Sequence, residues 1–269
     1  MMKVILRVLA LMTLLNAAAI ISGCGSGGSG SSSSGSLTLA LDKSTVESGG
    51  AVVATVTLTA STGQPVNNVS VRVMTSNSNV MNSATGTTNI DGKAYIHLSA
   101  KWLASDQQIY LVAGSDVTGN SSSAPLLVTA PKLAATLPAT SSYAVTNGTA
   151  GAVVRVVLQG TTLKFTNGAS LPIVNQSVDF TITSITNQRT GDIVVFFPSS
   201  GTIQSPTGIL QTVTDNTGTA NIPMAVDVVI PSIGSQHVIT INWQGTTEYA
   251  GNTYIITGSS QFTVVNSEG

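Results

Sequence analysis

An alternation of apolar and polar residues with a period of two runs through the chain from residue 37 onward. The clearest examples are AVVATVTLTA at 51–60, VSVRVMT at 69–75 and AYIHLS at 94–99. Successive side chains of a strand point to opposite faces of a sheet, so each segment predicts a half-buried antiparallel strand. No segment after residue 36 carries the apolar stripe of an amphipathic helix. The pattern therefore predicts an all-β fold.

Clusters of Gly, Asn, Pro and Ser separate the predicted strands about every ten residues. Short antiparallel strands at this spacing are typical of a sandwich of two sheets, and a closed barrel is the alternative. The chain has 269 residues, of which only 4 % are aromatic. Because this suits two modest cores better than one large core, we expect two sandwiches in tandem.

Three segments of the first half recur, in the same order, in the second half. GAVVATV (50–56) recurs as GAVVRVV (151–157), PVNNVSVRV (65–73) as PIVNQSVDF (172–180), and NIDGKAYI (89–96) as DNTGTANI (215–222). The offset grows from 101 to 107 to 126 residues, which predicts a duplicated module whose second copy carries insertions. The larger insertion holds IVVFFP at 193–198, which we interpret as a core strand. Chance similarity between two sandwiches rich in Val and Thr is the alternative.

The first copy resembles a known family. GQPV at 63–66 precedes a Val-alternating strand, and TNIDGKAYIHL at 88–98 follows. This order of turns resembles the bacterial Ig-like repeats of the invasin and intimin type, called Big-1 domains. The second copy keeps one turn, TDNTGTANI at 214–222, but has ASLPIV at 169–174 in place of the glycine–proline turn. The resemblance implies Ig-like sandwiches that act as stiff, non-catalytic spacers presenting a distal binding module.

Cys24 is the only cysteine of the chain. It follows two cations in residues 1–7, an apolar run at 8–21 and a Ser-Gly pair. This is the plan of a secretory signal, and the run is shorter than the roughly 20 residues of a membrane-spanning helix. ISGC at 21–24 resembles the lipobox of bacterial lipoproteins. The resemblance implies cleavage before Cys24 and acylation of its thiol, with a fatty acid such as palmitate. An ordinary export signal or an uncleaved anchor is the alternative.

Residues 25–36, GSGGSGSSSSGS, lack side chains that could form a core and predict a flexible tether with a span of about 20 Å. We therefore divide the chain into four parts. These are a signal peptide (1–23), a lipidated cysteine with a Gly/Ser linker (24–36), an Ig-like domain (37–130) and a second, diverged Ig-like sandwich with insertions (131–269).

The sequence offers little material for catalysis. Only 8 % of the residues are charged, and both histidines, His97 and His237, are interpreted as solvated strand residues. No motif of a nucleophile elbow, a zinc protease, a P-loop or a dinucleotide site occurs. Four aspartates in turn-like segments are interpreted as turn residues, while a calcium ion at the domain junction is left open: Asp91, Asp116, Asp192 and Asp215. We expect no catalytic residue, no metal and no cofactor.

After Cys24 the chain has 8 Lys and Arg against 11 Asp and Glu, a net charge of −3. The cations are scattered singly, so nucleic acid is not expected as a partner.

Aromatic residues gather in one segment, NWQGTTEYAGNTY at 242–254. Trp243, Tyr249 and Tyr254 are the candidate ligand-binding residues, for a protein or a glycan. The alternative, which we favour, is that Trp243 and Tyr254 fill the core and only Tyr249 is exposed.

Together these features predict a lipoprotein of the bacterial envelope, held by its lipid at the outer membrane or cell surface. Gly25 favours the outer membrane, since the lipoprotein resemblance implies that an aspartate after the cysteine marks inner-membrane retention. The expected function is adhesion, spacing or surface assembly. The alternative is a carbohydrate-binding protein or an accessory of an envelope enzyme that uses the 242–254 segment.

Overall fold

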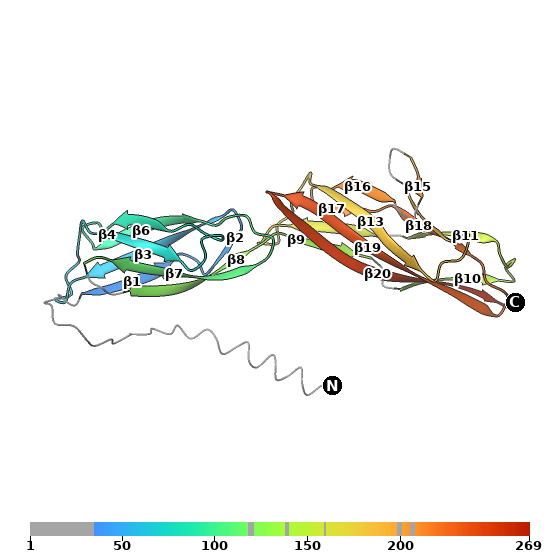
Figure 1. Ribbon diagram of the computed structural model, residues 1–269, viewed down its shortest axis with the longest axis horizontal. Helices are drawn as coiled ribbons and strands as arrows, with labels where there is room; N and C mark the ends of the chain where they lie inside the picture. The colour runs from blue at the N-terminus through green and yellow to red at the C-terminus, as the bar shows by residue number, and fades with distance from the viewer. Residues whose placement is uncertain (1–34, 118–120, 138–139, 159, 198–200, 205–207) are drawn as a thin grey trace, which may run out of the picture. The chain divides into compact units, whose positions relative to one another are not determined.

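In the part of the chain that the computed structural model describes, every regular element is a β-strand (Figure 1). The described residues are 35–117, 121–137, 140–158, 160–197, 201–204 and 208–269. Residues Ser34–Gly269 form one compact unit. The predicted signal peptide, Cys24 and the linker up to residue 34 lie outside the described residues. Within those residues, no helix is long and apolar enough to cross a bilayer.

The first eight strands form two sheets. They are β1 (Ser36–Leu41), β2 (Thr45–Glu47), β3 (Ala51–Thr59), β4 (Ser70–Thr75), β5 (Ala84–Thr87), β6 (Lys93–Ser99), β7 (Gln107–Ser115) and β8 (Ser121–Thr129). One sheet has the order β1-β3-β6 and the other the order β2-β8-β7-β4-β5. All pairs are antiparallel except β2 with β8, which is parallel.

Alternate side chains of these strands meet between the two sheets. On β3, Val52, Ala54, Val56 and Leu58 are fully buried, while the residues between them are partly exposed. Inward residues of both sheets join in a single aliphatic core. Two open sheets around one core form a sandwich, so the predicted all-β sandwich is confirmed and the barrel alternative is wrong.

The second half repeats this plan and adds further strands. They are β9 (Lys132–Thr136), β10 (Thr140–Thr146), β11 (Val153–Leu158), β12 (Thr162–Thr166), β13 (Ser177–Thr186), β14 (Ile193–Phe196), β15 (Ile203–Gln204), β16 (Ile209–Val213), β17 (Thr219–Asn221), β18 (Met224–Val229), β19 (Ser235–Tyr249) and β20 (Asn252–Ser267). The sheet orders are β10-β20-β19-β13-β16, β9-β12-β17 and β11-β18-β14-β15.

Two sheets of the second half correspond, strand by strand, to the two sheets of the first half. The sheet β10-β20-β19-β13-β16 matches β2-β8-β7-β4-β5, and in both the outermost pair at one edge, β10 with β20 or β2 with β8, is parallel. The sheet β9-β12-β17 matches β1-β3-β6. β11, β14, β15 and β18, which form the third sheet of the second half, have no counterpart among the strands of the first half. This correspondence supports duplication of one module.

A shared close approach of the backbone marks the equivalent turns. Gly92 and Gly218 have φ values of 70° and 74°. A Cβ atom at Gly92 would lie 2.5 Å from the carbonyl oxygen of Leu58, and one at Gly218 would lie 2.6 Å from that of Phe165. Both positions therefore require glycine, for its left-handed conformation and for its lack of a side chain.

The glycine–proline turn that the second copy lacks in sequence is nevertheless formed. Ser170, at the position equivalent to Gly63, has φ 64°, and Gly63 has φ 80°. Asn68 and Asn175, which follow in the two turns, both have φ 56°. A short polar side chain tolerates this region, so the turn keeps its backbone without glycine.

One of the repeated segments does not occupy equivalent positions. Val52 of GAVVATV is fully buried, whereas Val153 of GAVVRVV is 53 % exposed. GAVVATV lies on β3, whose equivalent in the second half is β12, whereas GAVVRVV lies on β11 in the third sheet, so the two segments are similar in sequence but do not occupy equivalent positions.

The insertion contributes a buried strand. β14 pairs antiparallel with β18, and Val194, Val195 and Phe196 are fully buried, which confirms a core strand over the IVVF part of IVVFFP, whereas Pro198 lies outside the described residues. In the second core, Phe180 lies against Phe196 edge to face, with ring centroids 5.9 Å apart, and stacks on Trp243 at 5.8 Å.

We expect Gly92→Ala to lower the free energy of unfolding by about 3 kcal/mol, because the new Cβ would meet the Leu58 carbonyl in a left-handed backbone. The matched control is Gly63→Ala, whose φ is 80° but whose Cβ would meet nothing within 4 Å. It should cost only about 1 kcal/mol. Urea denaturation followed by circular dichroism measures both, and equal losses would contradict the close approach.

Candidate functional site at the junction of the two sandwiches

Only two residues, Ala130 and Pro131, connect β8 to β9, and both are buried. Asp106, in the loop before β7, binds Ala130 of this linker and Lys132 directly after it. Its Oδ1 accepts a hydrogen bond of 2.8 Å from the Ala130 amide, and its Oδ2 lies 3.3 Å from Nζ of Lys132. The connection between the sandwiches is therefore short and bound on both sides to one carboxylate.

Aromatic rings from both sandwiches meet at the junction. Trp102, in the loop after β6, lies edge to face against Tyr249, with ring centroids 5.2 Å apart. Tyr249 in turn contacts Phe165 at 5.5 Å, and Phe165 contacts Tyr254 at 5.3 Å. These contacts join the end of β6 to the hairpin of β19 and β20.

A hydrogen bond crosses the junction beside these rings. The hydroxyl of Tyr254 donates to the carbonyl oxygen of Leu103 at 2.8 Å, and only 4 % of Tyr254 is exposed. Burial raises the pKa of Tyr254, and the neighbouring Tyr249 raises it further. The hydroxyl therefore keeps the proton that it donates.

A second side of the junction is polar. Nδ2 of Asn167 donates to Oε2 of Glu47 at 2.6 Å. Next to it, the backbone of Gly168 comes so close to Thr129 that a Cβ there would lie 2.5 Å from the Thr129 carbonyl oxygen. Ring contacts, two side-chain hydrogen bonds and a two-residue linker thus connect the sandwiches at several points. Such an arrangement restrains motion between the two sandwiches.

Two small grooves lie on the surface of the described residues. One at the junction has a volume of about 240 Å³ and is lined by Lys43, Glu47 and Thr129 with smaller residues. Another, of about 220 Å³, lies over β13, β16 and β19 and is lined by Gln176, Asp179 and neighbouring polar residues. Ligand pockets usually measure about 300 to 1,000 Å³ and are mainly apolar, so neither groove favours a small-molecule site.

The three predicted ligand-binding residues lie in different surroundings. Trp243 is 7 % exposed and stacks on Phe180 in the core, and Tyr254 is buried at the junction. Tyr249 is partly exposed and contacts rings from both sandwiches. This agrees with the core interpretation of the segment, since a ligand would reach only Tyr249.

Sequence reasoning missed the other half of the junction. Glu47, Trp102 and Leu103 belong to the first sandwich and lie more than 60 positions before Phe165. No motif links such distant residues, so only the folded chain brings them together. The one feature of the sequence that could have indicated this half of the junction is Trp102, an aromatic residue in a loop.

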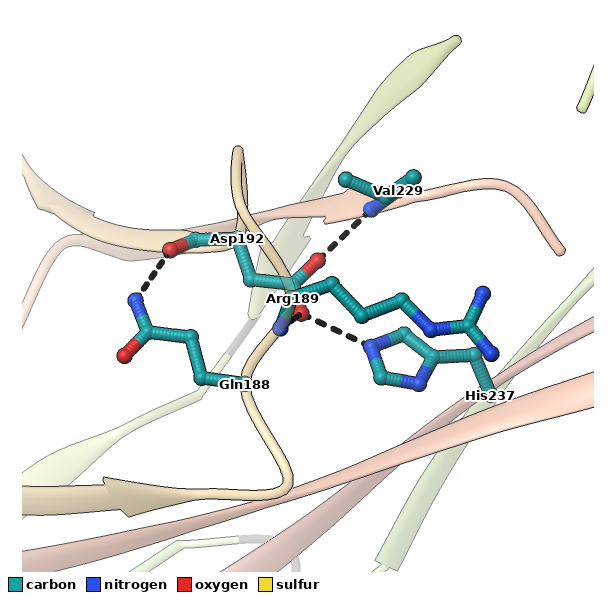
Figure 2. A network of polar contacts seen from close by, with 5 residues as sticks. All are labelled: Gln188, Arg189, Asp192, Val229 and His237. Atoms are coloured by element: carbon teal, nitrogen blue, oxygen red, sulfur yellow. Dashed lines mark hydrogen bonds and ion pairs between the residues drawn. The ribbon is translucent and has the colours of Figure 1, made fainter. Parts of the chain in front are cut away.

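A buried network lies in the second sandwich (Figure 2). The prediction of a solvated strand histidine is confirmed for His97, which is exposed, and is wrong for His237. His237 is 5 % exposed, and its Nε2 lies 2.7 Å from Oδ2 of Asp192. The two residues are 45 positions apart, so no local sequence pattern indicates their pairing.

Asp192 is fully bonded in this network. Its Oδ1 accepts from the Val229 amide at 2.7 Å, and its Oδ2 accepts from the Arg189 amide at 2.6 Å. The Gln188 side chain donates to its carbonyl oxygen (Figure 2). An Asp–His pair also occurs in hydrolase triads, where the second imidazole nitrogen binds a hydroxyl. No hydroxyl of the described residues bonds to His237. Through Val229 and His237, Asp192 connects the insertion to β18 and β19.

Asp215 is a turn residue, as predicted. Its Oδ1 accepts from the Thr217 hydroxyl and from the amides of Thr217 and Thr219. The hydroxyl bond, followed by the two amide bonds, lowers the pKa of Asp215. In the described part of the chain, no three His, Cys, Asp or Glu residues group around a possible metal position.

Removing the junction hydroxyl should loosen the loop that it binds. We expect Tyr254→Phe to raise hydrogen exchange about tenfold at the amides of residues 101–106, because the Leu103 carbonyl loses its partner. Tyr95→Phe, in a side chain that is 58 % exposed on β6, is the control and should change nothing. Unchanged exchange in Tyr254→Phe would contradict the role of this bond. Mass spectrometry of the exchanged protein gives the readout.

Removing the buried carboxylate should destabilise the second sandwich. Asp192→Ala leaves His237 and two amides without their acceptor, so we expect a loss of about 3 kcal/mol in the free energy of unfolding. Asp179→Ala is the control, since that side chain accepts one exposed hydrogen bond and should cost under about 0.5 kcal/mol. Similar losses in urea denaturation would show that burial of the pair is unimportant.

Neither a protein-family model nor a curated protein matches this sequence. Among solved structures, the chain is similar to the adhesin InvE of Yersinia pseudotuberculosis, with 14 % identity and a TM-score of 0.35, over 86 % of this chain and 59 % of InvE. It is similar to invasin, a bacterial integrin-binding protein, with 19 % identity and a TM-score of 0.36, over 81 % of this chain and 48 % of invasin. For the D0–D1 domains of intimin, the identity is 18 % and the TM-score 0.29, over 85 % and 98 %. The chain spans less than two thirds of the InvE and invasin structures, and these values assign it no family, ligand or partner.

Proposed function

We propose that this protein is a lipid-anchored adhesin or spacer of the bacterial cell surface, related to the Big-1 repeats and without catalytic activity. The observation that carries the proposal is the junction. Its linker is two residues long, and Tyr254, Trp102 and Asp106 bind across or beside it. Domains joined by a long polar linker move freely, whereas this connection suits a spacer that must keep its length.

The direction of the first sandwich fits an anchor at Cys24. Ser36, the first residue of β1, pairs with Thr59 at the end of β3. The other end of β3, at Ala51, pairs with Ser99, from which the chain runs to the junction residue Trp102. The chain thus enters the sandwich at the end away from the junction. A short tether from an acylated Cys24 would keep that end near the membrane.

The loops at the far end of the second sandwich form the proposed adhesive surface. Asn266 is fully buried and connects two of them: its Nδ2 donates to the carbonyl oxygens of Gly148 and Pro231, both at 2.8 Å. Asp192 holds a third loop. Ile233, 48 % exposed, lies in one of these supported turns. A fixed surface with an exposed apolar residue suits contact with another protein.

A membrane, through the lipid, and a protein or glycan on a facing surface are the proposed partners. The lipobox resemblance and Gly25 support the outer membrane. The small polar grooves and the scattered cations give no support to a cofactor, a substrate or nucleic acid.

Metabolic labelling with a palmitate analogue tests the anchor. We expect label on the wild-type chain and none on Cys24→Ser, because the lipobox resemblance places the diacylglycerol on the thiol of Cys24. Protease treatment of intact cells should then degrade the wild-type chain, whose sandwiches face outward. An unlabelled wild type would contradict the anchor, and a labelled chain that resists protease on intact cells would contradict surface exposure.

A further inference from the structure

β16 is an open edge of the second sandwich. It is the last strand of β10-β20-β19-β13-β16 and, among the described residues, pairs with β13 alone. The Thr214 amide donates to the Gln176 carbonyl. This bond identifies which residues of β16 turn their backbone groups toward β13. Since hydrogen-bonded pairs alternate along such a ladder, the backbone groups of Ile209, Gln211 and Val213 point to the open side.

The side chains of this edge are apolar and uncharged. Ile209 is 55 % exposed and Val213 is 54 % exposed, with Gln211 between them. The strand contains no charge, no proline and no bulge, which are the usual protections of an edge. In the first sandwich, the equivalent strand β5 has the hydroxyl side chain of Thr87 at the position of Val213. The apolar edge is therefore particular to the second sandwich.

We propose that β16 pairs antiparallel with β16 of a second copy of this chain, around a two-fold axis at Gln211. In this register, Ile209 lies opposite Val213 of the second copy, and Val213 lies opposite its Ile209. The two Gln211 amides face each other and can exchange hydrogen bonds. The backbone groups that point outward on both strands then become partners, and two five-stranded sheets join into one. The contact is self-complementary, as a two-fold interface must be.

Charge favours a second copy over a charged partner. The nearest acidic side chain on this face is Asp179, which lies opposite Gln211 on β13 and accepts a hydrogen bond from it. In the joined sheet, the two Asp179 residues would be three strand spacings apart, about 14 Å. This exceeds the Debye length of about 8 Å at physiological salt, so they repel weakly.

β11 offers a matched comparison within the same sandwich. It pairs only with β18 in the described part of the chain, and Val153 and Val157 are each 53 % exposed on either side of Arg155. Self-pairing around Arg155 would place two guanidinium groups opposite each other. Arg155 also binds Asp227 through two hydrogen bonds of 2.6 and 2.7 Å, which fix it on the strand. A central charge thus protects β11, and β16 has none.

Thiol cross-linking of the full chain on cells tests the pairing. Gln211→Cys places two thiols at the axis, so a short bismaleimide should yield a species of twice the chain mass, above the yield of the parent with Cys24 alone. Thr257→Cys, an exposed position on β20 of the same sheet, should give no such gain. Adding Ile209→Lys and Val213→Lys to Gln211→Cys should lower the yield at least tenfold, since like charges would face each other. Adding Val153→Lys and Val157→Lys instead should leave it unchanged.

Three results would overturn the proposal. They are no dimer from Gln211→Cys, equal yields with and without the β16 lysines, and a cross-linked species whose mass requires a different protein. Circular dichroism of each variant checks that the sandwiches are folded, which the exposure of these positions leads us to expect. The inference goes beyond the proposed function and does not need the lipid. Repeating the cross-link with Cys24→Ser therefore separates failure of the anchor from failure of the pairing.

Discussion

Burial of alternate side chains between two paired sheets is the interaction that holds each half of this protein together. With a single cysteine, the chain cannot form an internal disulfide, so packing carries the stability. The first core is aliphatic, and the second adds large rings such as Phe180, Phe196 and Trp243. Each buried large side chain contributes about 1.5 to 3 kcal/mol, and a slip of one residue would expose a whole strand face. The turns must therefore hold each strand in its register.

The turns preserve register by placing backbone against backbone. Gly92 and Gly218 let one turn of each sandwich touch the strand beside it at nearly the same distance. Ser170 shows that the neighbouring turn needs the left-handed conformation but not glycine itself. Once these turns fix the register, the second sandwich can lengthen the strands of its five-stranded sheet and add β11, β14, β15 and β18 without losing its core. Growth of the module occurs at the far end, where Asp192 and Asn266 hold the added loops.

Charge is scarce, and the described charged residues act at particular places. Asp106 binds both sides of the linker, Asp192 pairs with His237 at the insertion, and Arg155 lies at the centre of β11. Scarcity has a second effect, because an edge without charge stays open to another strand. The composition that suits a plain, non-catalytic spacer thus also permits association through β16.

The amino-acid sequence alone determined the strand content, the sandwich class and the core position of residues 193–196, since each follows from local period, turn residues or spacing. It also determined the lipobox resemblance of Cys24, which is a linear signal. Tertiary structure decided that Val153 points outward although it matches Val52, that His237 is buried against Asp192, and that Tyr254 binds the loop of Trp102. Residues in these contacts lie tens of positions apart, and a strand pattern specifies which face is buried but not which distant side chain lies against it.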